Sequence, residues 1–358
     1  MNTDATYSCS FRAMIAADLD VDLTLSAKLD LGTTFTLPSV STELIFQYQV
    51  GTVIAGSFPG VHTGVVIPVT FKDVTLDVGS FLNKIGIFYQ HSYDGISHSW
   101  AWDNVELRYA DTGTLFGQTA NFGVYVNNNP TMQDPWNTLP AWGFPLNGSP
   151  LAPTPSAATL IDGGLSQQVV GVGSYLLLNK TWYIDVGLYH TLGSGFQRWM
   201  GVDPSDETQV PGVAPYWRLA YTTRNEMGSS FWEIGTFGLA AETYPGRISA
   251  AGKDQLVDFG FDTQYQATFA NNDFVSMLSW THESETFSAS QPLGLTSNGH
   301  DNLWKAAATV HVLHNKTYGA AVQYFVTDGS RDALLNPESA NGSPLSDGFI
   351  FELNWRLV

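Results

Sequence analysis

The side chains that could do chemistry in this chain lie on the polar faces of alternating sequence runs. These faces carry Glu106, Arg108, Asp185, Arg218, Asp258, Asp262, Lys305, His311, Glu352 and Arg356. If the apolar faces meet lipid, the polar faces line a pore, and their slight excess of acids favours weak cation preference. Alternatively, these charges pair with one another and only stiffen the wall.

Enzymatic chemistry is not indicated. Asp258 and Asp262 lie four residues apart on one face, which is roughly 13 Å along a strand and too far for an acid–base pair. The chain contains no GxSxG, P-loop, HExxH or EF-hand motif. We therefore expect no enzyme activity.

Metal and haem sites are not indicated either. His311 and His314 fall on opposite strand faces, so they cannot chelate one ion together. Cys9 is the single cysteine, and without CxxCH the chain cannot attach a c-type haem. We expect no metal and no cofactor.

The composition favours an apolar, acidic β protein. Charged residues make up 13% of the chain, about half the usual share of roughly 25%. The formal net charge of −18 makes nucleic acid an improbable partner, because both carry negative charge. The N-terminus shows no signal peptide, and no run of 18 apolar residues predicts a membrane helix.

Period-two alternation predicts strands throughout the chain. It is clear in "VDLTLSAKLDL" (21–31), "DQLVDFGFDTQYQATF" (254–269) and "DGFIFELNWRLV" (347–358). Twelve strands fit between about 85 and 358. Four more fit near 6–17, 20–36, 43–54 and 64–82. Aromatic residues near strand ends predict interfacial girdles: Tyr89, Trp100, Trp102, Tyr109, Trp182, Tyr189, Tyr216, Trp217, Trp232, Trp280, Trp304 and Trp355.

Short and long connections alternate along the chain. Short turns are predicted at Asn83-Lys84, Asn179-Lys180 and Asn315-Lys316, and near Asp111–Gly113, Thr223–Gly228 and Asn271-Asn272. Longer connections fall near 92–98, 128–160, 192–214, 242–253, 284–301 and 329–346. Such segregation is typical of an outer-membrane barrel. We predict a single all-β domain, 1–358: an antiparallel up-and-down transmembrane β-barrel of about 16 strands.

The longest connection contains "NNNPTMQDPWNTLPAWGFP" (127–145), which is rich in proline and tryptophan. Its apolar side chains need a surface to cover them. We expect 127–157 to fold into the lumen and narrow it, with Asp134, Trp136, Trp142 and Phe144 as constriction candidates. The alternative is an external loop that packs on neighbouring loops or on a second subunit.

Several stretches resemble a family of proteobacterial outer-membrane proteins catalogued as c-type cytochromes. They are "WAWDNVELRYA" (100–110), "VNNNPTMQDPWNTLPAWGFP" (126–145), "GVAPYWRLA" (212–220), "IGTFGLAAE" (234–242) and "DFGFDTQYQ" (258–266). The resemblance covers about residues 85–355 and implies a porin-like barrel joined to a haem segment. This chain departs from it in lacking the CxxCH of that segment.

Three functions remain open from the sequence. The first is an outer-membrane porin-like channel for passive passage of small solutes or ions. The second, which the resemblance implies, is a barrel sheath that holds a separate haem protein for electron transfer. The third is a soluble all-β binding or assembly protein. For the membrane readings, the partners are outer-membrane lipid, with a homo-oligomer and a haem protein left open.

Overall fold

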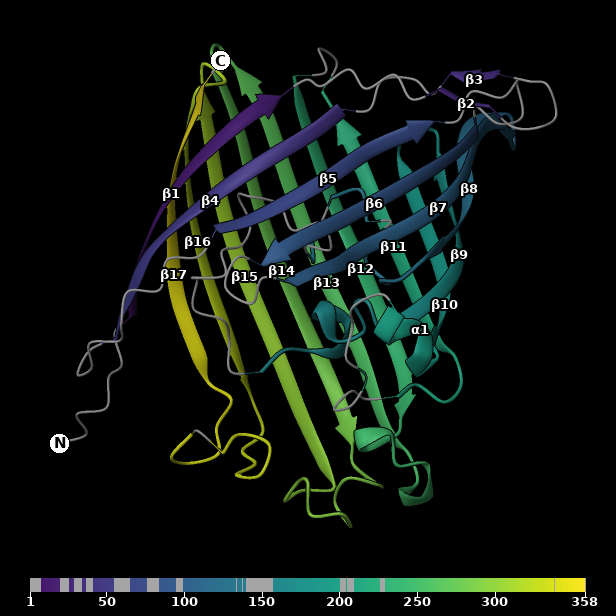
Figure 1. The fold of residues 1–358 in the computed structure, drawn as a ribbon, viewed down its shortest axis with the longest axis vertical. Coiled ribbons are helices and arrows are strands. Elements are labelled where there is room, and N and C mark those ends of the chain that lie inside the picture. Colours follow the sequence, from purple (N-terminus) through teal and green to yellow (C-terminus); the bar gives the residue numbers. More distant parts are fainter. Residues whose placement is uncertain are drawn as a thin grey trace.

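The computed structural model describes residues 8–19, 26–28, 34–36, 41–54, 65–75, 84–94, 99–132, 134–136, 138–139, 157–199, 204, 209–225, 229–337 and 339–357. Side chains are described within 84–85, 104–351 and at 353, apart from the gaps in these ranges. The structure is all-β (Figure 1). Within the described part, no helix has the length and hydropathy needed to span a membrane.

Most strands belong to one large sheet. Its first strands are β1 (Ser8–Leu19), β4 (Ser41–Ile54), β5 (Val65–Thr75), β6 (Ile85–Asp94), β7 (Ser99–Leu115) and β8 (Gln118–Asn127). The next are β9 (Val169–Leu178), β10 (Trp182–Thr191), β11 (Ala214–Arg224), β12 (Ser230–Thr243) and β13 (Asp254–Phe269). The last are β14 (Asn272–Thr286), β15 (His300–His314), β16 (Tyr318–Gly329) and β17 (Ser346–Leu357). Helical pieces are short: α1 (Ser194–Trp199), a π-helical turn (Leu160–Gly164) and two 3-10 turns (Pro245–Arg247 and Ser249–Ala251).

The sheet has up-and-down topology. From β7 to β17, eleven strands each pair antiparallel with the next one along the chain. β6, β5 and β4 extend this order on the N-terminal side. β1 pairs antiparallel with β4, and its residues Met14–Ala17 pair in parallel with β17.

The predicted strand at 20–36 is wrong as a single long strand. Its described parts are two three-residue strands, β2 (Ser26–Lys28) and β3 (Thr34–Thr36), which pair with each other in a separate sheet. The count of sixteen strands, which included this segment, is therefore not confirmed.

Two predicted hairpin turns are confirmed in detail. Asn179 and Lys180 have φ of 52° and 56°, and Asn315 and Lys316 have φ of 51° and 57°. Positive φ at both positions matches the right-handed twist of the flanking strands. The turn predicted near Asp111–Gly113 is wrong, because β7 continues to Leu115 and the chain reverses at Phe116-Gly117.

The two faces of the sheet have opposite chemistry. On β10, Tyr183 and Asp185 are buried, whereas Ile184, Val186 and Leu188 are 44–50% exposed. Exposed apolar residues recur on neighbouring strands: Leu107, Val124, Val126, Val170, Val172, Leu219, Ile234, Phe259, Phe261, Leu278, Val310 and Val322. The described part of the sheet thus presents an apolar face to its surroundings and buries ionisable groups on the other face.

The aromatic girdle prediction is partly wrong. Trp182, Trp217, Trp232 and Trp280 are exposed on the apolar face. Tyr189 and Tyr216, in contrast, are buried on the opposite face. Their parity along β10 and β11 matches that of the buried polar residues, and proximity to a strand end does not decide which face a ring occupies.

Small residues make room for these inner rings. Gly171 lies beneath the ring of Tyr189, and Gly173 beneath that of Tyr125, so closely that a Cβ at either glycine would collide with the ring. The rings join a core cluster that includes Val169, Phe237 and Leu239. Cross-strand aromatic–glycine packing therefore fills this part of the inner face.

Candidate functional site

The described ends of the β8–β9 connection pack on the inner face of the sheet. Leu139, Ile161 and Leu165 lie in the same buried cluster as Tyr189 and Phe237. The turn 160–164 lies inside the curve of the sheet and contacts β12 and β13 (Figure 1). The apolar side chains of the described loop ends are therefore covered by the wall of the same chain.

Arg218 of β11 is the centre of the first anchor. Its Nη2 and Nη1 donate to Asp262 Oδ2 and Oδ1 at 2.7 and 3.2 Å, and Nη2 also donates to Glu233 Oε1 at 3.1 Å. Arg218 Nε lies 3.2 Å from Asp134 Oδ1 in the loop, as an ion pair without aligned hydrogen-bond geometry. We call Arg218, Asp134, Glu233 and Asp262 the Arg218 cluster; each is at most 6% exposed.

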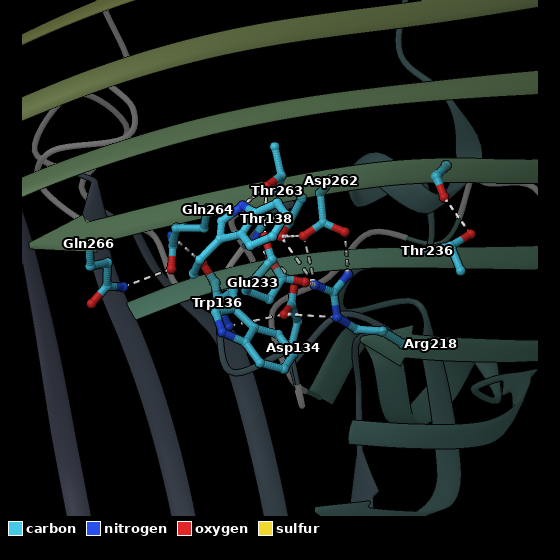
Figure 2. A network of polar contacts seen from close by, with 12 residues as sticks. Asp134, Trp136, Thr138, Arg218, Glu233, Thr236, Asp262, Thr263, Gln264 and Gln266 are labelled. Atoms are coloured by element: carbon cyan, nitrogen blue, oxygen red, sulfur yellow. Dashed lines mark hydrogen bonds and ion pairs between the residues drawn. The ribbon is translucent and has the colours of Figure 1, made fainter. Parts of the chain in front are cut away.

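The loop is folded locally around Asp134. Its carboxylate accepts the backbone N–H groups of Trp136 and Thr138 at 3.0 and 2.9 Å. Thr138 in turn donates its hydroxyl to Asp262 Oδ2 at 2.6 Å. Aspartate readily makes such local turns, so the sequence "DPWNT" (134–138) presents its carboxylate and hydroxyl together to the wall (Figure 2).

Trp136 covers the guanidinium. Its ring centroid lies 5.0 Å from Arg218 Cζ, and the ring meets that of Tyr183 edge-on with the centroids 5.3 Å apart. A cation over an indole face is attracted by the ring quadrupole, more strongly where water is excluded. Gln264 of β13 also donates to the Trp136 carbonyl at 3.4 Å.

The charges of the cluster do not balance. Three carboxyl groups surround one guanidinium, which leaves a formal charge of −2 if all three are ionised. Burial raises the pKa of Asp134, and the neighbouring carboxylate of Asp262 raises it further against the opposing effect of Arg218. Unpaired buried charge is costly, so the cluster favours holding a proton.

A second anchor holds the other end of the loop. The N–H groups of Leu160 and Ile161 each donate at 2.7 Å, to Glu283 Oε2 and Asp258 Oδ2 respectively. Asp258 and Glu283 are directly opposite each other on β13 and β14. Asp162 forms an ion pair with Lys305 of β15. The loop that leaves β8 therefore reaches β13, β14 and β15.

Three asparagines fix the start of the loop. Asn127 donates to Glu106 Oε2 at 3.3 Å, and Asn129 donates to Asn104 Oδ1 at 3.2 Å. Asn128 Oδ1 accepts the N–H of Val105 at 2.8 Å. The "NNN" run thus continues the β7–β8 pairing with side chains after the backbone ladder ends.

The remaining predicted residues are placed as follows. Asp185 is buried and accepts the hydroxyl of Tyr125 at 2.9 Å. Arg108 is partly exposed, with its Nε 3.9 Å from Glu106 Oε1. His311 is half-buried on β15. Glu352 and Arg356 lie on β17, where their side chains are not described, and Trp142 and Phe144 fall outside the described residues.

The structure brings together Asp134, Arg218 and Asp262, and separately Asp258 and Lys305 with the second anchor. Arg218 and Lys305 are both in ion pairs, as the wall-stiffening alternative expects. Sequence reasoning missed Glu233, Glu283 and Thr138. Alternation in "SFWEIGTF" (230–237) could have placed Glu233 opposite Trp232 and Ile234, but strand register alone sets Glu283 opposite Asp258.

Among the residues that the structure describes, no group of three or more histidine, cysteine, aspartate or glutamate side chains is arranged to hold a metal ion. No protein-family model matches the chain, and no curated protein matches it significantly. The geometry of the site is that of a loop held at both described ends on the inner, charged face of the sheet.

Proposed function

We propose that this protein is a porin-like channel of the bacterial outer membrane, for passive passage of small solutes or ions. In this proposal the sheet closes into a transmembrane β-barrel, and the β8–β9 loop narrows its lumen. The observation that carries the proposal is the inverted chemistry of the sheet: exposed apolar residues outside and buried ionisable residues inside.

The exposed apolar face supports a lipid environment. A soluble protein rarely exposes a continuous apolar patch above roughly 300–600 Å², whereas exposed aliphatic side chains here recur from β7 to β16. In a bilayer, every backbone group of a spanning strand must pair with a neighbour. The pairing of β1 with both β4 and β17 supports a sheet without free edges.

Loop lengths support the orientation of a barrel. The turns at Phe116-Gly117, 179–181, 270–271 and 315–317 are short. The connections at 128–168, 192–213, 244–253, 287–299 and 330–345 alternate with them and are longer. Outer-membrane barrels have short turns at the periplasmic end and longer loops outside.

The inner wall supports preference for cations. Acids outnumber bases on the described inner face of β10–β15: Asp185, Glu233, Asp254, Asp258, Asp262, Asp273, Glu283, Glu285 and Asp301 against Arg218, Arg224 and Lys305. Rings of acidic side chains favour cations in pores. In a potassium chloride gradient, we expect a reversal potential whose sign shows that potassium is more permeant than chloride.

The test is extraction, gel mobility and conductance of the purified chain. We expect the protein to require detergent, to migrate faster on a gel before boiling than after it, and to conduct in a planar bilayer. A monodisperse protein without detergent contradicts the membrane proposal. A folded, heat-modifiable protein that never conducts but co-purifies with a haem protein and its Soret band favours the sheath alternative.

A further inference from the structure

We propose that the Arg218 cluster is a proton-operated latch for the loop residues 131–132, 134–136 and 138–139. The cluster holds this segment on the wall while one of its three carboxyl groups carries a proton, and it releases the segment when all three are ionised. The inference deepens the proposed function, on which it rests only for its effect on conductance.

The latch has two fixed carboxylates and one on a loop. Glu233 and Asp262 stand on neighbouring strands, and both reach over Gly235, where a Cβ would lie 2.5 Å from Glu233 Oε1 and 2.6 Å from Asp262 Oδ1. Only Asp134 belongs to the loop, so only Asp134 can leave without breaking the sheet. Mutual repulsion of the carboxylates therefore acts on the loop.

Among the described residues, Arg218 is the basic side chain that pairs with the carboxyl groups of the cluster. The described ion pairs of Asp134, Glu233 and Asp262 all end on Arg218. On β10, Asp185 and Tyr183 also face the cluster, and on β11 Tyr216 does so. Asp185 adds negative potential, because its charge and that of Asp134 repel each other and each makes ionisation of the other less favourable. Excess charge must therefore be relieved by a proton or by separation.

The second anchor limits the movement. Residues 160–162 are held separately, by Glu283, Asp258 and Lys305. Release of Asp134 thus frees Trp136 and Leu139 while the far end stays on β13–β15. We expect the segment to be docked in acid and released toward alkaline pH.

Cysteine accessibility tests the latch independently of conductance. In a Cys9→Ser background, Leu139→Cys places a thiol on the segment, and Leu303→Cys places a comparably buried thiol on β15, outside the cluster that contains Leu139. The ratio of their labelling rates by one water-soluble reagent cancels the ordinary effect of pH on thiols. We expect this ratio to rise roughly tenfold from acidic to alkaline pH, as in a local opening.

Neutralising one carboxyl should keep the latch closed. Glu233→Gln lowers the formal charge of the fully ionised cluster from −2 to −1, and the rise in labelling should move up by at least about one pH unit, a tenfold change in proton activity. Asp134→Asn should act in the same direction. Glu242→Gln, which removes an exposed partner of Lys253, is the control and should change nothing.

The outcomes separate the two proposals. A labelling ratio that is independent of pH, or equal profiles for Glu233→Gln and Glu242→Gln, overturns the latch even if the protein conducts. A ratio that shifts as expected in a protein that never conducts supports the latch and contradicts the channel. Gel mobility before boiling identifies any variant that has not folded, and Asp134→Asn then replaces Glu233→Gln.

Discussion

Arg218 joins β11 to β12, to β13 and to the loop through three ion pairs. A buried ion cluster of this kind gives little net stability compared with an apolar core, but removal of one partner leaves the others uncompensated. Its role is therefore to fix the position of the loop and not to strengthen the sheet.

At this scale we predict that Arg218→Met lowers the free energy of unfolding by about 3–5 kcal/mol at neutral pH. The loss should shrink in acid, because the three carboxyl groups that lose their counter-charge are then protonated and no longer leave buried charge unpaired. The pKa of Asp134 is already raised in the parent protein, mainly by burial, so its protonated form suits the folded state. Urea unfolding at two pH values measures this. Lys253→Met removes an exposed ion pair and should have no measurable effect; equal losses for both variants contradict the argument.

At the scale of elements, the Asn-Lys-Thr turns repeat one local structure. In each, the threonine hydroxyl donates to the asparagine carbonyl at 3.0 Å, and the lysine has positive φ. Such φ values cost a non-glycine residue roughly 1–2 kcal/mol. The hairpins therefore carry strain that could be removed without altering the sheet.

We predict that Lys180→Gly stabilises the protein by roughly 0.5–1 kcal/mol, since glycine adopts this φ without steric cost. Lys316→Gly should act alike. The readout is the urea midpoint at unchanged slope. Thr181→Gly, which deletes the hydroxyl bond in the same turn, should destabilise the protein. Stabilisation by both substitutions, or by neither, contradicts the argument, because an added glycine acts on the unfolded chain only to destabilise the fold.

Asp332 organises two long loops. Its carboxylate accepts backbone N–H groups at 2.6–3.1 Å from both the 287–299 and the 330–345 connections: Ser297, Asn298, Leu334 and Leu335. Burial by itself would raise the pKa of Asp332, but the hydrogen bonds from these four N–H groups outweigh burial and lower that pKa. The stabilisation is thus present above the ordinary carboxyl pKa and is lost as pH falls through the lowered one.

Asp332→Asn should weaken both loops locally by about 1–3 kcal/mol, because an amide cannot replace both carboxylate oxygens as acceptors. Limited proteolysis should cut within 287–299 and 330–345 sooner than in the parent protein. Asp328→Asn is the matched control, since Asp328 accepts one N–H, from Gly329. Unchanged cleavage in Asp332→Asn contradicts the assigned role.

At the scale of the whole molecule, the proposed membrane setting predicts the cost of a charge on the outer face. Ile184 is 44% exposed and lies between Leu176 and Leu219 on adjacent strands. Ile184→Lys should cost about 2–4 kcal/mol for a protein folded in lipid vesicles, by burial of an ammonium in hydrocarbon.

Phe116→Lys is the control, at a turn residue that is 87% exposed, and it should be nearly neutral. For a protein folded in water, Ile184→Lys should also be nearly neutral, within roughly 0.5 kcal/mol. Urea titration in vesicles therefore distinguishes the two settings through a single pair of variants.

The all-β class, the strand alternation and the Asn-Lys turns could be predicted from the sequence, because each depends on side-chain parity or on the φ preference of one or two neighbouring residues. Prediction from the sequence failed for Tyr189 and Tyr216, where parity was not used, and for the single strand expected at 20–36, whose described residues form two short strands that pair with each other. The contacts of Arg218 with Asp134, Glu233 and Asp262, in contrast, arise from the tertiary structure. These residues are up to 128 positions from one another, and their meeting depends on strand register and loop path, which no local pattern encodes.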